Sequence, residues 1–213
     1  MADEDKLVYF SVRARAEPIR MLYVLAGEKF VDERHDLADW PGKREVLNPP
    51  LGQLPIFTTK EGLLCQTTTI SRYVGKKLGL VGNGLWDETL NDLIVETLQE
   101  FINDFATKFI LWKILKIVPE PDDSDKILNE LREGHLRRIE YIRSISEKKG
   151  GHKFLLDDKM QLADVWLYTT LEWTRPAFPD AMEITPWVVE YVSKFENDPT
   201  MKEYLASRPE TLI

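Results

Sequence analysis

The first eighty residues alternate short apolar runs with helical patterns. Residues 7–10 form an apolar run that predicts a strand, and residues 30–35 predict a second one. Between them, residues 17–27 predict a helix, because Pro18 stands in the first turn and Gly27 follows the last apolar position. The chain therefore begins with a strand, a helix and another strand.

A hairpin follows these elements. Residues 54–59 and 62–66 predict its two strands, which turn at the sequence KEG. Residues 67–80 then predict a helix, whose apolar positions share one face at helical spacing. The whole order, strand–helix–strand and then strand–strand–helix, predicts a mixed sheet covered by helices.

The second part of the chain is helical throughout. Apolar residues recur at helical spacing from Leu90 to Trp112, a stretch longer than an average helix. The sequence PEPDDSD ends that helix and starts another, and EKKGGHK and several prolines separate the later ones. We therefore expect an α/β domain at residues 1–81 and an all-helical domain at residues 86–213.

The charge of the chain narrows the choice of ligand. The 213 residues carry a formal net charge of −8, from 28 basic and 36 acidic side chains. This balance argues against nucleic acid or an anionic membrane as partner. Residues 1–80 hold 12 basic against 11 acidic side chains, while residues 86–213 hold 16 against 25. We expect a small anion to bind the nearly neutral N-terminal part.

Cysteine and histidine usage points away from disulfides and metals. The single cysteine, Cys65, excludes an internal disulfide framework, and we expect it to pack as a small hydrophobe. His35, His135 and His152 lie far apart without metal-ligand spacing, so we expect no metal. The acidic start MADEDKLVYF lacks the features of a signal peptide, and no run reaches membrane-spanning length. These features favour a cytoplasmic protein.

The junction between hairpin and helix is a candidate anion site. Gln66 and Thr67 fall there, and the free N–H groups of the first helical turn, the Thr67 hydroxyl and the helix dipole all attract an anion. Alternatively, Thr67 only caps the helix. If the peptide bond before Pro55 is cis, the backbone N–H and C=O of Leu54 face outward and can pair with a peptide-like ligand. Otherwise Pro55 is a loop proline.

Tyr9 at the end of the first strand and Arg15 before the first helix form a second candidate. A hydroxyl and a cation there favour a ligand, although packing of Tyr9 within the strand is the alternative. Together with ADWPGKR, LGQLP and QT, the sequence YFSVRARAEPIR resembles the glutathione transferases. The resemblance continues through ETLQEFIND and LADVWLY to the C-terminal RP. It is closest to the sigma-like group, which includes haematopoietic prostaglandin D synthase and cephalopod lens crystallins.

The resemblance implies a thioredoxin-like N-terminal domain that binds glutathione, a helical domain that completes the acceptor site and the dimer interface, and a homodimer. It implies that Tyr9 stabilises the glutathione thiolate, with Arg15 as a nearby cation, and that Glu100 reaches in from the partner subunit. Carried over by position, the glutathione site comprises Tyr9, Arg15, Trp40, Lys43, Arg44, Gln53, Leu54, Gln66, Thr67 and Glu100. The acceptor pocket comprises Phe10, Val12, Arg13, Ala14, Phe105, Thr107 and Phe109.

The implied activity is transfer of glutathione sulfur to an electrophilic, mostly apolar substrate. Isomerase activity of the prostaglandin type and hydroperoxide reduction are possible at the same site. A crystallin-like structural protein or a non-catalytic carrier of apolar ligands could also use this fold.

Three positions depart from the family pattern. Ala14 replaces a glycine, so a positive φ there would be strained. Gln161 replaces a serine or threonine at a helix start, so we expect this helix to begin less firmly. Thr107 replaces an acceptor-site tryptophan of the prostaglandin synthase, which weakens the isomerase interpretation.

Overall fold

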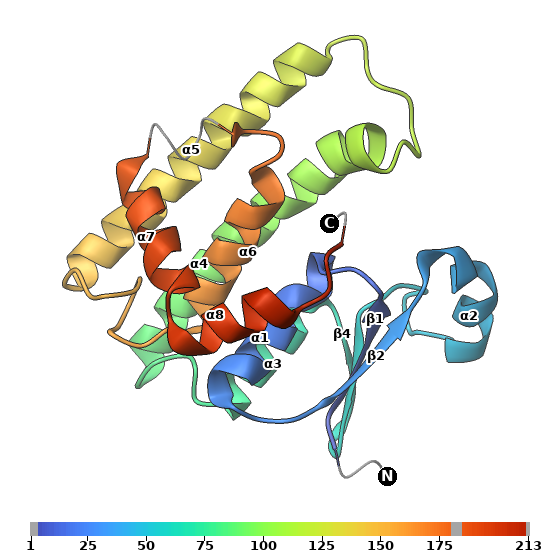
Figure 1. Cartoon of the computed structure of the whole chain (residues 1–213), viewed down its shortest axis with the longest axis horizontal. Coiled ribbons are helices and arrows are strands. Elements are labelled where there is room, and N and C mark those ends of the chain that lie inside the picture. The colour runs from blue at the N-terminus through green and yellow to red at the C-terminus, as the bar shows by residue number, and fades with distance from the viewer. Residues whose placement is uncertain (1–3, 180–184, 212–213) are drawn as a thin grey trace. The chain divides into compact units, whose positions relative to one another are not determined.

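A computed structural model describes residues 4–179 and 185–211 of the chain. Packing divides the chain into two compact units (Figure 1). The sheet unit comprises Met1–Val81 together with Phe195–Ile213, and the helical unit comprises Gly82–Lys194. The stretch expected to form one helical domain, residues 86–213, thus includes a C-terminal segment that belongs to the sheet unit.

The sheet unit is built on four strands in the order β2-β1-β3-β4. β1 pairs in parallel with β2, while β3 is antiparallel to both β1 and β4. The predicted mixed sheet is confirmed, and the strand ends differ only slightly from those expected. The strands are β1 (Lys6–Phe10), β2 (Val31–His35), β3 (Ile56–Thr59) and β4 (Gly62–Cys65).

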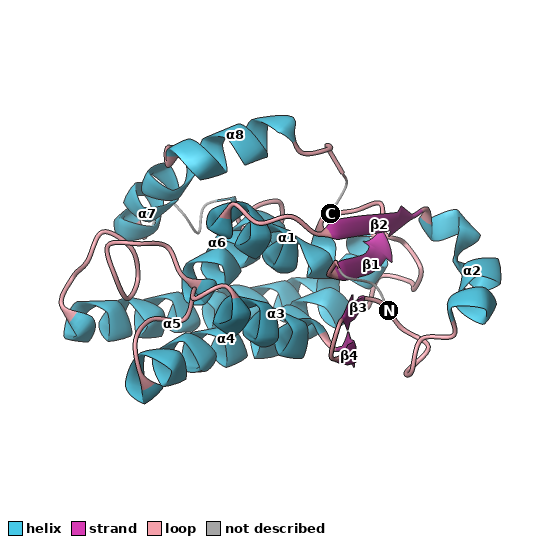
Figure 2. Cartoon of the chain, turned by 90° about the horizontal axis from the view of Figure 1, so that it is seen from below, coloured by secondary structure: helices cyan, strands magenta, loops and turns pink. Residues whose placement is uncertain are grey.

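Helices lie on both sides of this sheet (Figures 1 and 2). α1 and α3 pack against each other on one side, and α2 lies on the other (Figures 1 and 2). α1 begins with proline in its first turn and ends at Gly27, whose φ of 67° is the left-handed value that glycine adopts without strain. The elements are η1 (Ala14–Ala16), α1 (Glu17–Ala26), η2 (Leu37–Asp39), α2 (Trp40–Leu47), α3 (Thr67–Lys77) and α8 (Pro199–Ser207).

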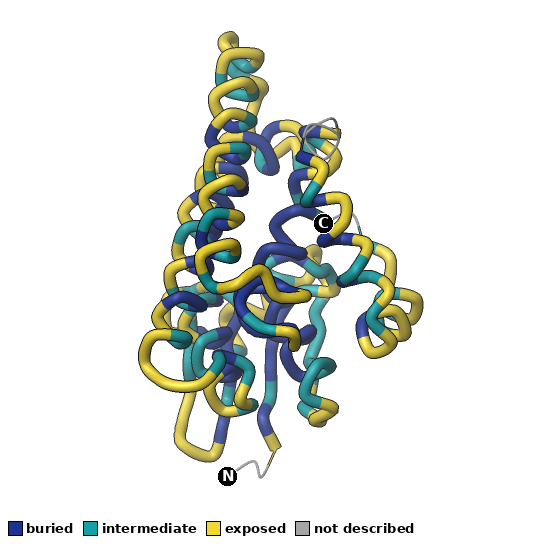
Figure 3. Tube along the Cα trace, turned by 90° about the vertical axis from the view of Figure 1, so that its left-hand side faces the viewer, coloured by how far each residue is buried: buried dark blue, intermediate teal, exposed yellow. Residues whose placement is uncertain are grey.

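The helical unit contains no strand among its described residues, 82–179 and 185–194. The long helix predicted from Leu90 to Trp112 is present, but it changes from an α-helix to a π-helix at Ala106. α6 packs against α4 and is buried around most of its circumference. In Figure 3 the long helices alternate between buried and exposed positions along each turn. The elements are α4 (Leu85–Phe105), η3 (Ala106–Ile114), α5 (Ser124–Lys149), α6 (Leu162–Thr174) and α7 (Pro186–Glu196).

The expectation of a weak start to α6 is wrong. The N–H of Ala163, in its first turn, donates to Asn91 Oδ1 at 2.9 Å, and the N–H of Gln161 donates to Asp164 Oδ2 at 2.8 Å. Asn91 comes from α4 and also donates its amide to Gln161 Oε1 at 2.7 Å. Side chains other than a local serine or threonine therefore satisfy the first N–H groups of α6.

Candidate functional site

The strand registers bring three separate parts of the sequence to one end of the sheet. Val8 of β1 pairs with Ile56 of β3, and Ile56 pairs with Cys65 of β4. The C-terminal end of β1, the N-terminal end of β3 and the C-terminal end of β4 therefore meet, and α1 and α3 begin at the same edge. The predicted residues that adjoin this edge are Tyr9, Arg15, Leu54, Gln66 and Thr67.

Tyr9 is buried at this edge, with 5% of its surface exposed. Burial raises the pKa of its hydroxyl above the ordinary value of 10.0. A hydrogen bond from the Arg15 backbone and the charges of Arg15 and Arg20 oppose that rise in pKa. The hydroxyl is therefore protonated at neutral pH and able to donate a hydrogen bond, with the Arg15 N–H fixing its oxygen.

Aromatic contacts join the β1 end to α2. The ring of Phe10 lies 5.2 Å from that of Tyr9 and 5.2 Å from that of Trp40, with the second pair edge to face. Trp40, at the start of α2, is thus brought towards the Tyr9 end of the sheet. Arg44 and Lys43 are both exposed on the same helix.

The loop before β3 lies against Arg44. A side chain added at Gly52 would collide with the Arg44 guanidinium, and the backbone there has a φ of 62°. The structure therefore brings Arg44 beside the loop that carries Gln53 and Leu54. The Leu54–Pro55 peptide bond is cis, and the strand ladder begins only after it, at Ile56. Gln53 is exposed and Leu54 is half-buried.

The start of α3 lies at the same edge of the sheet. Gln66 occupies the N-cap position with a φ of 73°, an uncommon conformation for a residue other than glycine, and Thr67 is the first helical residue. The alternative in which Thr67 caps α3 is wrong, and no side-chain cap is seen at this N-terminus among the described residues. Such a helix start presents N–H groups to an anion. Cys65 precedes it, half-buried in β4.

The loop between Tyr9 and Arg15 contains the expected strain. Ala14 has a φ of 35° and is buried, so it occupies a conformation that its β-carbon disfavours. Arg13 does not extend as a free cation, because it donates to Thr211 Oγ1 and to the Thr211 carbonyl oxygen. Arg20 donates to the carbonyl oxygens of Val12 and Arg13.

Sequence reasoning missed the residues that hold this loop, namely Arg20, Arg208 and Thr211. The one local signal was the spacing of Glu17 and Arg20, which suits an ion pair across one helical turn and forms one at 3.3 Å. Thr211 lies at the far end of the sequence, where nothing in the local pattern connects it to Arg13.

The remaining predicted acceptor residues belong to the helical unit. Phe105 and Phe109 are buried there, with ring centroids 4.9 Å apart, and contribute to the core of that unit. Thr107 is exposed, and its hydroxyl donates to carbonyl oxygens of its own helix, at Asn103 and Asp104. An acceptor pocket that combines these residues with Phe10, Val12, Arg13 and Ala14 stays a prediction.

Glu100 is displayed on the surface of α4. Its side chain is 74% exposed, and one carboxylate oxygen lies 3.2 Å from a guanidinium nitrogen of Arg138 in α5. Arg138 also lies over the ring of Phe101. Any role of Glu100 in binding an ammonium group would therefore compete with this ion pair.

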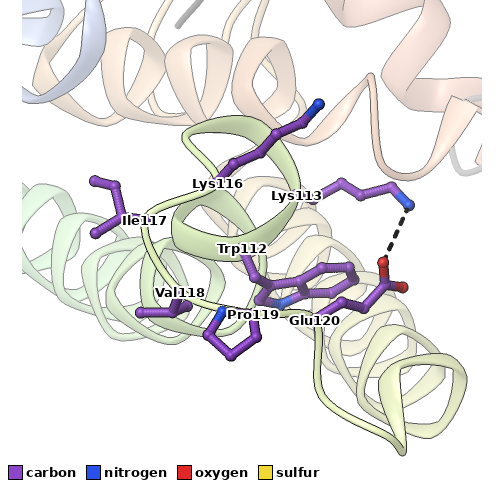
Figure 4. Close-up of a pocket in the computed structure, with 7 residues that line it drawn as sticks. All are labelled: Trp112, Lys113, Lys116, Ile117, Val118, Pro119 and Glu120. Carbon is purple, nitrogen blue, oxygen red and sulfur yellow. Dashed lines mark ion pairs between the residues drawn. The ribbon is translucent and has the colours of Figure 1, made fainter.

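Among the hollows that the described residues line, two open on the helical unit, and none of the predicted residues lines either of these two. Figure 4 shows the hollow that follows η3, where an ion pair of 3.9 Å joins Lys113 to Glu120. The other adjoins α5, the loop at residues 152–155 and α7. Over the described residues, no group of three or more histidine, cysteine and acidic side chains is suited to hold a metal ion. Within the same residues, no helix combines the length and the hydropathy needed to cross a membrane.

Comparison with known proteins agrees with this geometry. The family profile described as "Glutathione S-transferase, C-terminal domain" matches residues 95–208, more than half of the chain. The chain belongs to the glutathione S-transferase family. Glutathione S-transferase 3 of Caenorhabditis elegans is 32% identical over 213 residues, which cover 97% of each chain. Membership makes the chain a glutathione S-transferase, with glutathione as its co-substrate.

Two further similarities bear on the finer assignments. Hematopoietic prostaglandin D synthase of Homo sapiens is 28% identical over 209 residues, which cover 98% of each chain. The solved structure of a protein named as monomeric Na-GST-3, a glutathione S-transferase of the hookworm Necator americanus, matches with a TM-score of 0.84 at 28% identity. That match covers 98% of each chain. The expected fold class, with a thioredoxin-like sheet domain and a helical domain, is confirmed.

Proposed function

We propose that this glutathione S-transferase conjugates glutathione to electrophilic, apolar substrates and that Tyr9 stabilises the reacting thiolate. The observation that carries the proposal is the buried, protonated Tyr9 hydroxyl, whose oxygen is fixed by the Arg15 backbone at the sheet edge. A hydroxyl in this state donates to sulfur and favours its charged form. Arg15 adds a positive charge to the same site.

The size of the required effect is modest. A thiol with a pKa near 8.5 is about 3% ionised at pH 7. Lowering that pKa to about 6.5 takes about 2.7 kcal/mol and raises the thiolate fraction roughly 25-fold. One charge-assisted hydrogen bond and a nearby cation are together of the right magnitude to supply it.

The rest of the glutathione site comes from the same edge, from α2 and from the loop beside α2. The N–H groups at the start of α3 and the Thr67 hydroxyl hold the γ-glutamyl carboxylate, and the Leu54 backbone pairs with the peptide. The other end of glutathione is bound by side chains of α2 and of the loop beside it, namely Trp40, Lys43, Arg44 and Gln53. This assignment is supported by the Phe10–Trp40 ring contact and by the position of Arg44 against Gly52.

A conjugation assay with a generic aromatic electrophile tests the activity, because a crystallin-like protein or a ligand carrier would bind without turnover. The Tyr9→Phe variant tests the mechanism. We expect it to bind glutathione with little change in affinity while its turnover at neutral pH falls. The thiolate absorbance of the complex, titrated against pH, should move towards the midpoint of free glutathione. An unchanged midpoint would remove Tyr9 from this role.

We further propose a sigma-like, cytoplasmic homodimer. The sequence motifs and the likeness to the human prostaglandin synthase favour the class. The exposed apolar side chains of α4, Leu85, Trp86 and Leu93, favour a surface that a second subunit covers. Since the hookworm relative is named as monomeric, assembly needs its own measurement. Equilibrium sedimentation that finds only a species of 24.8 kDa at micromolar concentration would refute the dimer.

Prostaglandin isomerisation is the second candidate activity, and the 28% identity to the human synthase favours it. Thr107 is a specific observation against it, because its hydroxyl bonds to its own helix where the synthase carries an aromatic side chain. Product analysis with a prostaglandin endoperoxide and glutathione would distinguish isomerisation from conjugation.

A further inference from the structure

The loop at residues 11–14 lies between Tyr9 and Arg15 in the sequence. The buried side chain of Arg20 forms hydrogen bonds to the loop backbone. The Arg20 guanidinium donates to the carbonyl oxygen of Val12 at 2.8 Å and to that of Arg13 at 3.3 Å. It also donates to Asp32 Oδ2 at 3.0 Å. With 1% of Arg20 exposed, these bonds are shielded from water. One buried side chain therefore donates to two carbonyl oxygens of the loop, and that of Arg13 also accepts the Glu17 N–H at 3.1 Å.

The C-terminal tail, residues 208–211, forms hydrogen bonds to the same loop through Thr211. Thr211 Oγ1 accepts from the Arg13 backbone N–H at 3.3 Å and from Arg13 Nε at 3.0 Å. The carbonyl oxygen of Thr211 accepts from Arg13 Nη2 at 2.9 Å. Figures 1 and 2 both show the chain leaving α8 and running back towards the sheet. Within the sheet unit, the tail and the loop are thus joined at three points.

The Glu17 carboxylate bonds both to Arg20 and to Arg208 of the tail. Arg208 Nη1 donates to Glu17 Oε1 at 2.9 Å, and the Tyr204 hydroxyl donates to the same oxygen at 2.9 Å. Arg20 Nη1 lies 3.3 Å from the other oxygen, Oε2. The Arg208 and Glu17 side chains are 9% and 2% exposed. Ion pairs so shielded are sensitive to the loss of one partner, so the network favours a single arrangement of tail, helix and loop.

We propose that the C-terminal tail is a positioning element of the glutathione site. By fixing the loop between Tyr9 and Arg15, it holds the Tyr9 hydroxyl and Arg15 in place relative to each other. The inference rests on the proposed function of Tyr9. Ala14 in this loop holds a φ of 35°, and such a conformation persists only where surrounding contacts impose it. Without the tail, the loop relaxes, and the bond between the Arg15 backbone and the Tyr9 oxygen is weakened.

Thr211→Val is the main test, because it keeps the shape of the side chain and removes the Oγ1 acceptor. Ser207→Ala is its matched control, since the Ser207 hydroxyl donates to the Tyr204 carbonyl oxygen of its own helix at 3.2 Å. For Thr211→Val we expect the thiolate absorbance midpoint of the glutathione complex to rise and kcat at neutral pH to fall several-fold. KM for glutathione should change little, and the control should match the wild type.

Arg208 offers a second, independent test. Arg208→Leu should change the midpoint in the same direction, and Arg208→Lys should recover part of the change because it keeps a cation beside Glu17. A lower melting temperature with an unchanged midpoint and kcat, in both Thr211→Val and Arg208→Leu, would assign the tail to stability alone and overturn the inference. If the wild type shows neither a lowered midpoint nor turnover, the proposed function itself fails, which is seen before any tail variant is measured.

Discussion

Asn91 of α4 caps the start of α6. Its Oδ1 accepts the N–H of Ala163 at 2.9 Å, and its amide donates to Gln161 Oε1 at 2.7 Å. Asn91 is wholly buried. Gln161 orients the Asn91 amide and also forms a capping box with Asp164, so the start of α6 is capped both from its own segment and from α4.

Gln161→Thr should lower the free energy of unfolding by about 1–2 kcal/mol, because the shorter side chain removes one of the acceptors of the buried Asn91 amide, which then keeps its bond to the Asp87 carbonyl oxygen. Asn91→Ala should lower it by about 2–3 kcal/mol, since it removes the bonds to Ala163, Gln161 and Asp87. Asn129→Ala, at an exposed position of α5, is the control. Urea unfolding gives the values, and a rise in stability for Gln161→Thr would show that threonine caps α6 after all.

The start of α6 also shows where sequence reasoning stops. The pattern places Gln161 at a helix start correctly. Asn91, which also caps this helix, lies 70 positions earlier, and only the packing of α4 on α6 brings it there. α2 was missed for a related reason. It has no buried residue, so it lacks an apolar face for a periodic pattern to reveal. The first strand and α1 were predictable because an apolar run and helix-end signals are local features of the sequence.

At the sheet edge that carries the proposed glutathione site, local features were again predictable and long-range contacts were not. Tyr9 and Gln66 stand at element ends that the pattern predicts, and the strand registers then bring those ends together. The contact of Arg13 with Thr211 depends on the path of the whole chain, which no local pattern encodes.

Ala14→Gly should raise the free energy of unfolding by about 0.5–1 kcal/mol, because glycine adopts the observed φ of 35° without the strain of a β-carbon. Ala16→Gly is the matched control, since Ala16 is also buried but has an ordinary φ of −89° and should lose stability. Denaturant midpoints compare the two. Equal losses in both variants would mean that the Ala14 methyl group contributes more through packing than it costs through strain.

His135 should make stability depend on acid pH. Its ring stacks on Phe101 at 4.9 Å, and its Nε2 lies 3.2 Å from the Thr174 hydroxyl. Burial, and then the charge of Arg138, lower the pKa of His135 from 6.5 to about 4. The folded protein keeps the ring neutral while the unfolded chain takes up a proton. The contribution of His135 is therefore complete above about pH 6.5 and is lost as the pH falls towards 4.

Between pH 6.5 and pH 4, the contribution of His135 to the free energy of unfolding should fall by an amount on the order of 3 kcal/mol. Asp164 acts in the opposite sense, because burial raises its pKa from 3.8 to about 6, so its contribution grows as the pH falls through 6. The quantity to measure is thus the difference in the free energy of unfolding between wild type and His135→Gln at each pH. His152→Gln, at an exposed position, is the control. The stability advantage of the wild type over His135→Gln should shrink as the medium is acidified. An advantage that stays constant would show that His135 does not titrate as described.

Glu100 provides the last test, of whether each glutathione site depends on a second subunit. The sheet edge binds the γ-glutamyl carboxylate in our proposal, but the ammonium group of glutathione needs an acid, and Glu100 of the partner subunit is the candidate. Its ion pair with Arg138 at 3.2 Å is exposed enough to be exchanged for a ligand. Glu100→Ala should weaken glutathione binding by about 1 kcal/mol, and by up to about 3 kcal/mol if the dimer shields the contact.

A glutathione analogue without the amine separates this role from a structural one, since it should lose far less affinity on the same substitution. Glu133→Ala, which removes another exposed acid of an ion pair, is the control for net charge. Arg138→Ala should leave binding intact or strengthen it, because it frees Glu100 from its competitor. Calorimetry on samples whose assembly has been checked by sedimentation gives the affinities. Equal losses for glutathione and its analogue would mean that Glu100 acts through folding or assembly and does not contact the amine.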